Sequence, residues 1–235
     1  MNLIFHGEVI NYEFINNKSD HTILFLHGWG GNKNSFKSTI NLLKRKFNIL
    51  TLTMPTIQNT QLVWDMFDYK NLVLSLLHNL NLKSVYIICH SFGFRVVSLL
   101  NNFFDIKKII VTGGAGIKKT SIFKKISIKN NKILLKNDNF SYIFKKIAST
   151  DYLSLSITNR ETFKKVVNLN TKNFVQFSCP TLIFWGAKDK ETPIWIAKFL
   201  HKRNNAKLIK TKGGHFAYIE QNSLFNNSVL EFFND

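Results

Sequence analysis

The chain has 235 residues, 45% of them hydrophobic and 20% charged, which excludes an intrinsically disordered protein and allows one α/β domain with a sizeable core. Its formal net charge of +18 is compatible with a nucleic-acid or anionic-surface partner. Lysine greatly outnumbers arginine, however, asparagine and isoleucine are abundant as under A/T-rich codon usage, and no RNP, zinc-finger, basic-zipper or P-loop pattern is present, so we expect no nucleic-acid partner.

Strands and helices alternate in the first half of the chain. Apolar and β-branched runs predict strands, and apolar residues at helical spacing predict helices. The predicted strands are a hairpin in "NLIFHGEVINYEFI" around Gly7, then "TILFLHG", "FNILTLTMP", "SVYIICH" and "IKKIIVTGG". The predicted helices are 35–46, 65–79 and "FGFRVVSLLNNF".

The alternation of strands and helices stops between about residues 116 and 175, where the hydrophobic pattern is helical, lysine is abundant and no convincing buried strand is present. It then returns with the strands "PTLIFWGAKD" and "AKLIKT" and the helices "PIWIAKFLHKR" and "NSLFNNSVLEFF". We therefore predict an α/β fold with a mostly parallel sheet flanked by helices. Its core domain would comprise 1–115 and 176–235, and 116–175 would form an inserted helical cap.

Ser91 lies between a predicted buried strand and a predicted helix, in the pentapeptide "CHSFG". This has the form of a G-x-S-x-G nucleophile elbow in which Cys89 replaces the first glycine and Gly93 is kept. Small residues are needed there because the sharp turn brings neighbouring backbone atoms close together. Taken alone, the pattern fits a helix-capping serine equally well.

A catalytic serine needs a histidine base, and that histidine needs a carboxylate to orient it. The chain order expected with a G-x-S-x-G elbow is Ser, then Asp or Glu, then His. Asp189 closes "TLIFWGAKD" and His215 lies in "TKGGHFAYIE", each in a loop after a predicted strand. Each also fits an ordinary loop residue, but their order favours Ser91 as nucleophile, His215 as general base and acid, and Asp189 as the orienting carboxylate.

The loop "HGWGG" follows the predicted strand "TILFL" and precedes a predicted helix. An oxyanion hole needs backbone N–H groups aimed at the developing negative charge. We expect these donors to be the N–H of Trp29, in this loop, and that of Phe92, directly after Ser91. The alternative is a glycine-rich turn with no catalytic role.

Four stretches, "LFLHGWGGNKNSF", "ICHSFGFRVVSLL", "PTLIFWGAKDKETP" and "GGHFAYIE", together resemble the α/β-hydrolase fold family, and within it bacterial serine hydrolases of the esterase type with a short helical cap. The resemblance covers nearly the whole chain. It implies the triad and oxyanion donors named above, and a substrate site lined by His27, Gly28 and His90. It implies no metal and no organic cofactor. The chain departs from the family pattern at Cys89 and Phe94, which replace glycines, and at "TMPTIQNT", where many relatives carry D-x-P-G-x-G.

We therefore expect a carboxylesterase-like serine hydrolase that cleaves a carboxylic ester or thioester through an acyl-enzyme. Amidase, aminopeptidase and carbon–carbon bond hydrolase activities use the same triad and stay open. The resemblance argues against dehalogenase and epoxide hydrolase chemistry, which in this family uses an aspartate nucleophile. The alternatives from another class are a non-catalytic binding protein and a peripheral membrane protein on the same fold.

Several residues of the predicted cap are phenylalanines and lysines, which we expect to shape the acyl pocket: Phe123, Lys124, Lys125, Phe140, Phe144, Lys145 and Lys146. A basic cap is complementary in charge to an acidic acyl-carrier protein. The HGWG loop also resembles that of the carrier-protein methyl esterases of biotin synthesis, which implies such a carrier as a candidate partner. Cys89 and Cys179 have neither disulfide-framework nor zinc-ligand spacing. With no signal-peptide pattern and no long apolar run, we expect a cytoplasmic protein without stable membrane insertion.

Overall fold

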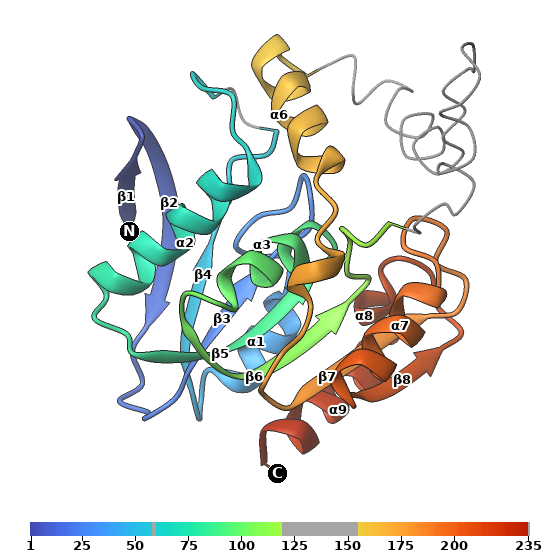
Figure 1. Cartoon of the computed structure of the whole chain (residues 1–235). Coiled ribbons are helices and arrows are strands. Elements are labelled where there is room, and N and C mark those ends of the chain that lie inside the picture. The colour runs from blue at the N-terminus through green and yellow to red at the C-terminus, as the bar shows by residue number, and fades with distance from the viewer. Residues whose placement is uncertain (58–59, 119–154, 235) are drawn as a thin grey trace, which may run out of the picture.

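An eight-stranded sheet forms the centre of the molecule (Figure 1). The computed structural model describes residues 1–57, 60–118 and 155–234. The strand order is β1-β2-β4-β3-β5-β6-β7-β8, with antiparallel pairs β1·β2 and β2·β4 at one edge and parallel pairs elsewhere. The strands are β1 (Asn2–Phe5), β2 (Glu8–Ile15), β3 (Thr22–Leu26), β4 (Asn48–Leu52), β5 (Ser84–His90), β6 (Asp105–Thr112), β7 (Thr181–Gly186) and β8 (Lys207–Thr211).

Helices cover both faces of this sheet. Buried residues of α2 (Met66–Asn79), α3 (Phe92–Leu100) and α7 (Trp195–Asn204) pack into one hydrophobic core. Buried residues of α1 (Lys37–Leu43), α8 (Ala217–Glu220) and α9 (Asn222–Asn234) pack into a second core on the opposite face. The described part also contains α6 (Ile157–Asn168) and the short 3₁₀ helix η3 (Lys172–Phe174).

The central strands are apolar on both faces, which is why they read as continuous hydrophobic runs. In β5, Val85, Ile87 and Cys89 point into the first core, while Tyr86 and Ile88 point into the second. This alternation follows from the two-residue period of a strand. A central parallel sheet covered on both faces therefore accounts for the runs seen in the sequence.

The predicted fold class is confirmed, and each predicted strand is present. The first helix is shorter than the predicted 35–46, because residues 32–35 form turns in which Asn32 N–H donates to Ser35 Oγ (3.0 Å) and Asn34 N–H donates to Asn32 Oδ1 (2.8 Å). The short elements α8 and η3 were not predicted, since one helical turn leaves no clear periodicity.

The helix α6 is the main described element of the predicted cap. Its Ser156 cap accepts a hydrogen bond from the Asn159 N–H, and its buried side chains dock onto the chain before α2. There, the Trp64 N–H donates to Thr162 Oγ1 (3.0 Å) and the Thr60 hydroxyl donates to Asn159 Oδ1 (3.0 Å). The boundaries 116 and 175 of the cap stay predictions.

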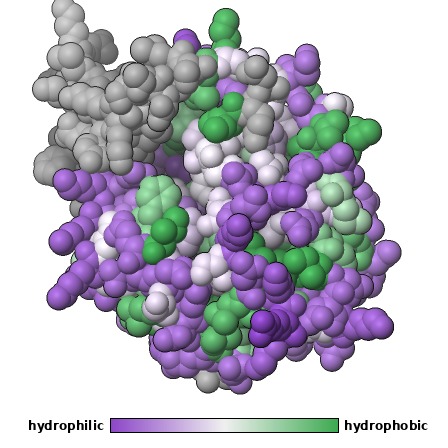
Figure 2. All heavy atoms as spheres, turned by 180° about the vertical axis from the view of Figure 1, so that it is seen from behind, coloured by the Kyte–Doolittle hydropathy of each residue, from purple (hydrophilic) through white to green (hydrophobic). Residues whose placement is uncertain are grey.

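The surface opposite to the view of Figure 1 is mostly hydrophilic, and its apolar atoms form small separate groups (Figure 2). Within the ranges that the structure describes, no helix combines the length and apolarity needed to cross a membrane.

Candidate active site

Ser91 occupies the turn between β5 and α3, at the carboxyl end of a central strand. Its backbone has φ 48° and ψ −109°, a conformation that costs a non-glycine residue on the order of 1–3 kcal/mol. Hydrogen bonds hold it there: the Ser91 N–H donates to the Thr112 carbonyl (3.1 Å), and the Ser91 carbonyl accepts from the N–H of Phe94 and of Ala115 (3.1 Å each). The turn therefore presents the Ser91 side chain beyond the end of the sheet.

Gly93 allows this turn to pack against β3. A Cβ atom at Gly93 would lie 2.3 Å from the carbonyl oxygen of Leu26, a backbone atom that cannot move aside. The need for a small residue two positions after the serine is thus a contact with the neighbouring strand.

Ser91, His215 and Asp189 lie in one hydrogen-bonded row. The distance from Ser91 Oγ to His215 Nε2 is 3.0 Å, and that from His215 Nδ1 to Asp189 Oδ2 is 2.9 Å. The side chains of His215 and Asp189 are 7% and 0% exposed. When Nδ1–H donates to the carboxylate, the Nε2 lone pair faces the serine hydroxyl, as proton removal from that hydroxyl requires.

The carboxylate of Asp189 is held in place by its own loop. Its Oδ1 accepts hydrogen bonds from the backbone N–H of Glu191 (2.9 Å) and Thr192 (2.8 Å), and its Oδ2 accepts one from the Thr192 hydroxyl (2.6 Å). Burial alone would raise the pKa of the Asp189 carboxyl, but the hydrogen bonds from His215 and Thr192 outweigh burial and hold the pKa below its usual value. The group is therefore a carboxylate at neutral pH.

The His215 loop is shaped by close backbone contacts. The Gly214 N–H donates to Glu220 Oε2 (2.7 Å), and a Cβ at Gly186, the end of β7, would lie 2.1 Å from the Gly214 carbonyl. The loops after β7 and β8 can meet because these positions lack side chains.

The backbone N–H groups of Trp29 and Phe92 donate no hydrogen bond to another described residue. In the Trp29 loop, the Gly31 N–H donates to the Gly28 carbonyl (3.0 Å) and the Gly30 N–H donates to Thr56 Oγ1 (3.1 Å). The Trp29 ring packs edge-on against the Phe92 ring, with 5.4 Å between centroids. The loop after β3 is thus fixed beside the first turn of α3.

Comparisons with known proteins give the same fold. No family model matches the chain. It is 22% identical to the uncharacterized hydrolase YugF of Bacillus subtilis, over 96% of this chain and 94% of that protein, and 24% identical to the AB hydrolase superfamily protein YisY of the same species, over 90% and 91%.

Among solved structures, an esterase from Exiguobacterium antarcticum superposes with a TM-score of 0.80 (14% identity; 100% and 99% of the two chains). The enol-lactonase of Burkholderia xenovorans superposes with 0.78 (11%; 100% of both chains), and the meta-cleavage product hydrolase of Pseudomonas fluorescens with 0.70 (16%; 100% and 97%). The chain has the α/β-hydrolase fold.

His27 and His90 are buried next to the candidate active site, in the Trp29 loop and directly before Ser91. Each is 2% exposed; His27 Nε2 accepts from the Met54 N–H (2.8 Å), and His90 Nδ1 lies 3.0 Å from the Thr112 carbonyl. Burial lowers the pKa of His27 to about 4 and, together with the nearby His215, that of His90 to about 3. Their burial argues against the predicted substrate contact by both rings.

Gly28, the third residue predicted to line the substrate site, lies against one of these histidines. A Cβ at Gly28 would be 2.9 Å from His90 Cδ2 and 3.4 Å from Ser91 Cβ. The glycine lets the Trp29 loop approach Ser91, and the substrate contact expected of Gly28 stays a prediction.

Two of the positions that depart from the α/β-hydrolase sequence pattern, Cys89 and Phe94, are accommodated by packing. Cys89 is fully buried in the first core and its thiol contacts the Ile110 carbonyl (3.6 Å). Phe94 fits because Gly114 faces it: a Cβ there would lie 2.8 Å from the Phe94 ring. At Pro55, within the third departure, the backbone carbonyl accepts a hydrogen bond from the buried Tyr69 hydroxyl.

Sequence reasoning missed Glu191, whose Oε2 lies 3.3 Å from His215 Nε2. It also missed Thr192, whose hydroxyl lies 3.2 Å from His215 Nδ1 as well as bonding to Asp189. The only signal was their place two and three residues after Asp189, in "DKETP".

One residue of the predicted cap contacts the Trp29 ring. Phe163 of α6 packs against the Trp29 ring with 5.1 Å between centroids. The phenylalanines and lysines predicted to shape the acyl pocket, Phe123, Lys124, Lys125, Phe140, Phe144, Lys145 and Lys146, lie outside the described residues. Their role, and that of an acyl-carrier partner, stays a prediction.

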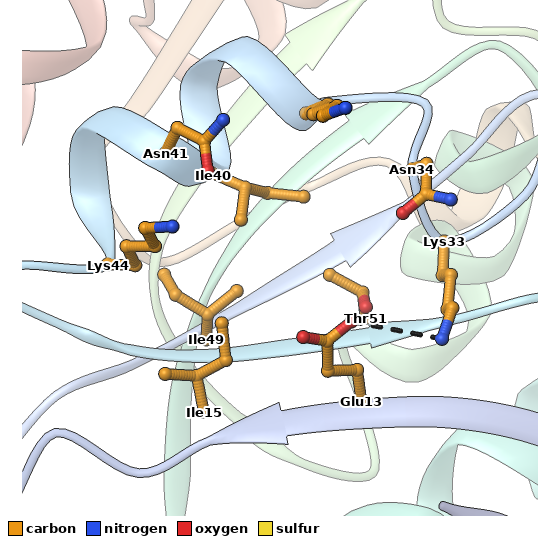
Figure 3. Close-up of a pocket in the computed structure, with 10 residues that line it drawn as sticks. Glu13, Ile15, Lys33, Asn34, Ile40, Asn41, Lys44, Ile49 and Thr51 are labelled. Atoms are coloured by element: carbon orange, nitrogen blue, oxygen red, sulfur yellow. Dashed lines mark ion pairs between the residues drawn. The ribbon is translucent and has the colours of Figure 1, made fainter.

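A separate surface hollow lies between α1 and the β2·β4 edge (Figure 3). Lys33 and Glu13 face each other across it, with 3.8 Å between Nζ and Oε2. None of the predicted site residues lines this hollow. Among the described residues, no group of three or more His, Cys, Asp or Glu side chains is arranged to hold a metal ion.

Proposed function

We propose that the protein is a serine hydrolase that cleaves a carboxylic ester or thioester through the row Ser91, His215 and Asp189. The observation that carries this proposal is the continuous contact from Ser91 Oγ to His215 Nε2 (3.0 Å) and from His215 Nδ1 to Asp189 (2.9 Å). A serine in a strained turn gains nothing for stability from that row, whereas acyl transfer needs each member of it.

In the first step, His215 Nε2 takes the hydroxyl proton of Ser91 while Oγ forms a bond to the substrate carbonyl carbon. The carbonyl electron pair moves onto oxygen, where the N–H groups of Trp29 and Phe92 stabilise the negative charge. Nε2–H then protonates the leaving alcohol or thiol as its bond to carbon breaks, which leaves an acyl group on Ser91.

In the second step, water takes the place of the alcohol. His215 Nε2 removes a proton from the water as its oxygen attacks the acyl carbon, and the proton is returned to Ser91 Oγ when the acid leaves. Asp189 stays ionised throughout and stabilises the positively charged imidazole, consistent with a carboxyl pKa below its usual value.

The meta-cleavage product hydrolase among the structural neighbours keeps carbon–carbon bond hydrolysis as the second candidate. Both reactions suit the same nucleophile and oxyanion donors. The two reactions differ in the leaving group, so assays with both kinds of substrate are needed to distinguish them.

A panel of p-nitrophenyl esters and matching thioesters of graded chain length tests the proposal. We expect hydrolysis by the native protein and a loss of kcat of at least about a thousandfold in Ser91→Ala. Ser223→Ala removes an exposed serine of α9 and should retain full activity. Equal rates in Ser91→Ala and the native protein would refute the role given to Ser91.

A further inference from the structure

The hydroxyl of Thr192 lies between the carboxylate and the imidazole of the Ser91 row. Its Oγ1 is 2.6 Å from Asp189 Oδ2 and 3.2 Å from His215 Nδ1. Thr192 is 5% exposed, and the mechanism above assigns it no task.

The direction of the hydroxyl hydrogen follows from its neighbours. Because the pKa of the Asp189 carboxyl lies below its usual value, Oδ2 carries no hydrogen at neutral pH, and the Thr192 hydroxyl donates to it. The single hydrogen of the hydroxyl is then used, so its oxygen faces His215 Nδ1 as an acceptor. Both groups next to Nδ1, at 2.9 and 3.2 Å, are therefore acceptors.

Two acceptors at Nδ1 select one tautomer of the imidazole. A neutral imidazole carries its hydrogen on one ring nitrogen only. With the hydrogen on Nδ1, both acceptors share it, and the lone pair of Nε2 faces Ser91 Oγ at 3.0 Å. With the hydrogen on Nε2, the lone pair of Nδ1 would face both oxygens unless the 2.6 Å bond from Thr192 to Asp189 were broken. Thr192 thus disfavours the tautomer that cannot remove the serine proton.

The same hydroxyl fixes the carboxylate oxygen that faces the imidazole. Asp189 Oδ1 accepts hydrogen bonds from the backbone N–H of Glu191 and Thr192. Oδ2 accepts from the Thr192 hydroxyl and from His215 itself. The hydroxyl therefore holds Oδ2 in place while His215 gains and loses a proton at Nε2.

Thr192 is itself anchored to the sheet. Its carbonyl accepts a hydrogen bond from the indole N–H of Trp185 (2.8 Å), a fully buried residue of β7. Pro193 follows directly and narrows the backbone conformations open to Thr192. The position of the hydroxyl is thus set by β7 and its loop, independently of His215.

We propose that Thr192 is a positioning residue of the active site, whose hydroxyl keeps the hydrogen of His215 on Nδ1 and holds Asp189 Oδ2 against it. This inference rests on the serine-hydrolase function proposed above. Thr192 acts through Asp189 and His215 and takes no part in bond cleavage itself.

Three substitutions separate the hydroxyl from the shape of the side chain. Thr192→Val keeps the shape and removes the hydroxyl, whereas Thr192→Ser keeps the hydroxyl and removes a methyl group. The matched control is Thr181→Val, because Thr181 is also 5% exposed and begins β7 at the end of the strand away from the Asp189 loop. Its hydroxyl donates to the Cys179 carbonyl (3.1 Å).

With p-nitrophenyl acetate as substrate, we expect Thr192→Val to lower kcat about tenfold or more with little change in KM, the size expected for loss of a hydrogen bond to a charged group. Thr192→Ser should restore most of that loss, and Thr181→Val should keep the native kcat. The rate of Ser91 labelling by a fluorophosphonate should fall in parallel with kcat, because both reactions need the Ser91 proton removed. Thr192→Ala also lacks the hydroxyl and should match Thr192→Val, so the test does not depend on one folded variant.

The outcomes separate this inference from the proposed function. A native kcat in folded Thr192→Val, or equal losses in Thr192→Ser and Thr192→Val, overturns the role of the hydroxyl. A loss in Thr181→Val as large as that in Thr192→Val overturns it too. Each of these results leaves the serine hydrolase intact, whereas a folded native protein that neither hydrolyses the ester nor is labelled at Ser91 overturns both.

Discussion

A side chain added at Gly93 would collide with strand β3, whereas one added at Gly7 would meet no other atom. Comparing alanine variants at the two positions therefore tests whether the turn that carries Ser91 packs against β3. A Cβ at Gly93 would come within 2.3 Å of the Leu26 carbonyl oxygen, whereas one at Gly7 would have no neighbour within 4 Å. Gly7 has φ 78°, so alanine there should cost about 1 kcal/mol through backbone strain alone.

We expect Gly93→Ala to lower the free energy of unfolding by at least about 3 kcal/mol, because β3 and α3 must move apart. Urea denaturation of Gly93→Ala and Gly7→Ala gives the comparison. Equal losses in the two variants would show that the elbow is not packed against β3 as described.

Single residues also show where sequence reasoning ends. Ser91, Asp189 and His215 could be singled out because their chain order and their places after strands are visible in the sequence. Thr192 and Glu191 could not, because their contacts with His215 depend on how the loop after β7 folds around Asp189. Burial of the His27 and His90 rings depends on packing between loops, which a motif does not describe.

At the scale of elements, α6 is tied to α3 by one buried cation. Arg95 is 6% exposed, and its Nη1 donates to the carbonyls of Val166 (3.0 Å) and Leu169 (2.8 Å) at the end of α6. Burial lowers the pKa of Arg95 to about 10, so the guanidinium stays charged at neutral pH. A cation at the carboxyl end of a helix is also favoured by the helix dipole.

Arg95→Gln should loosen α6 while the rest of the sheet stays intact. Its shorter, neutral side chain cannot satisfy both carbonyls, so we expect faster hydrogen exchange in α6, by about tenfold or more, with exchange in β7 unchanged. Arg203→Gln is the control, because exposed Arg203 lies on α7, where it makes a long hydrogen bond to Gln176 (3.4 Å) and lies 6.0 Å from the centroid of the Phe199 ring. Equal exchange of α6 in the two variants would contradict the anchoring role of Arg95.

How well a strand or helix could be predicted from the sequence depended on its length. The long apolar runs and helical periods identified the strands and the larger helices, since burial on both faces of the sheet leaves a strong signal. The first helix was overestimated because the side chains of Asn32 and Ser35 hold turns that periodicity cannot show. The four-residue α8 was missed because a single helical turn shows no hydrophobic periodicity.

For the whole molecule, the buried neutral histidines predict how stability depends on pH. The folded pKa values of His27 and His90, about 4 and about 3, lie below the ordinary histidine value of 6.5. Between these values the unfolded chain binds more protons than the folded one, so stability is full above about pH 6.5 and falls as pH decreases toward 4.

We expect a loss on the order of 2 kcal/mol per buried histidine at pH 5 relative to pH 7. His27→Gln keeps an acceptor for the Met54 N–H and should reduce this slope by about half. Urea denaturation at several pH values measures it. An equally steep slope in His27→Gln, or no slope in the native protein, would contradict the burial of neutral rings.

The most direct measurement of the central claim, that Ser91 is an activated nucleophile, is the mass of the native protein after reaction with a fluorophosphonate. The account predicts one covalent adduct, mapped to the peptide containing Ser91, absent in Ser91→Ala and slowed at least about a thousandfold in His215→Ala. A folded native protein that forms no adduct, or forms it on another residue, would contradict the account.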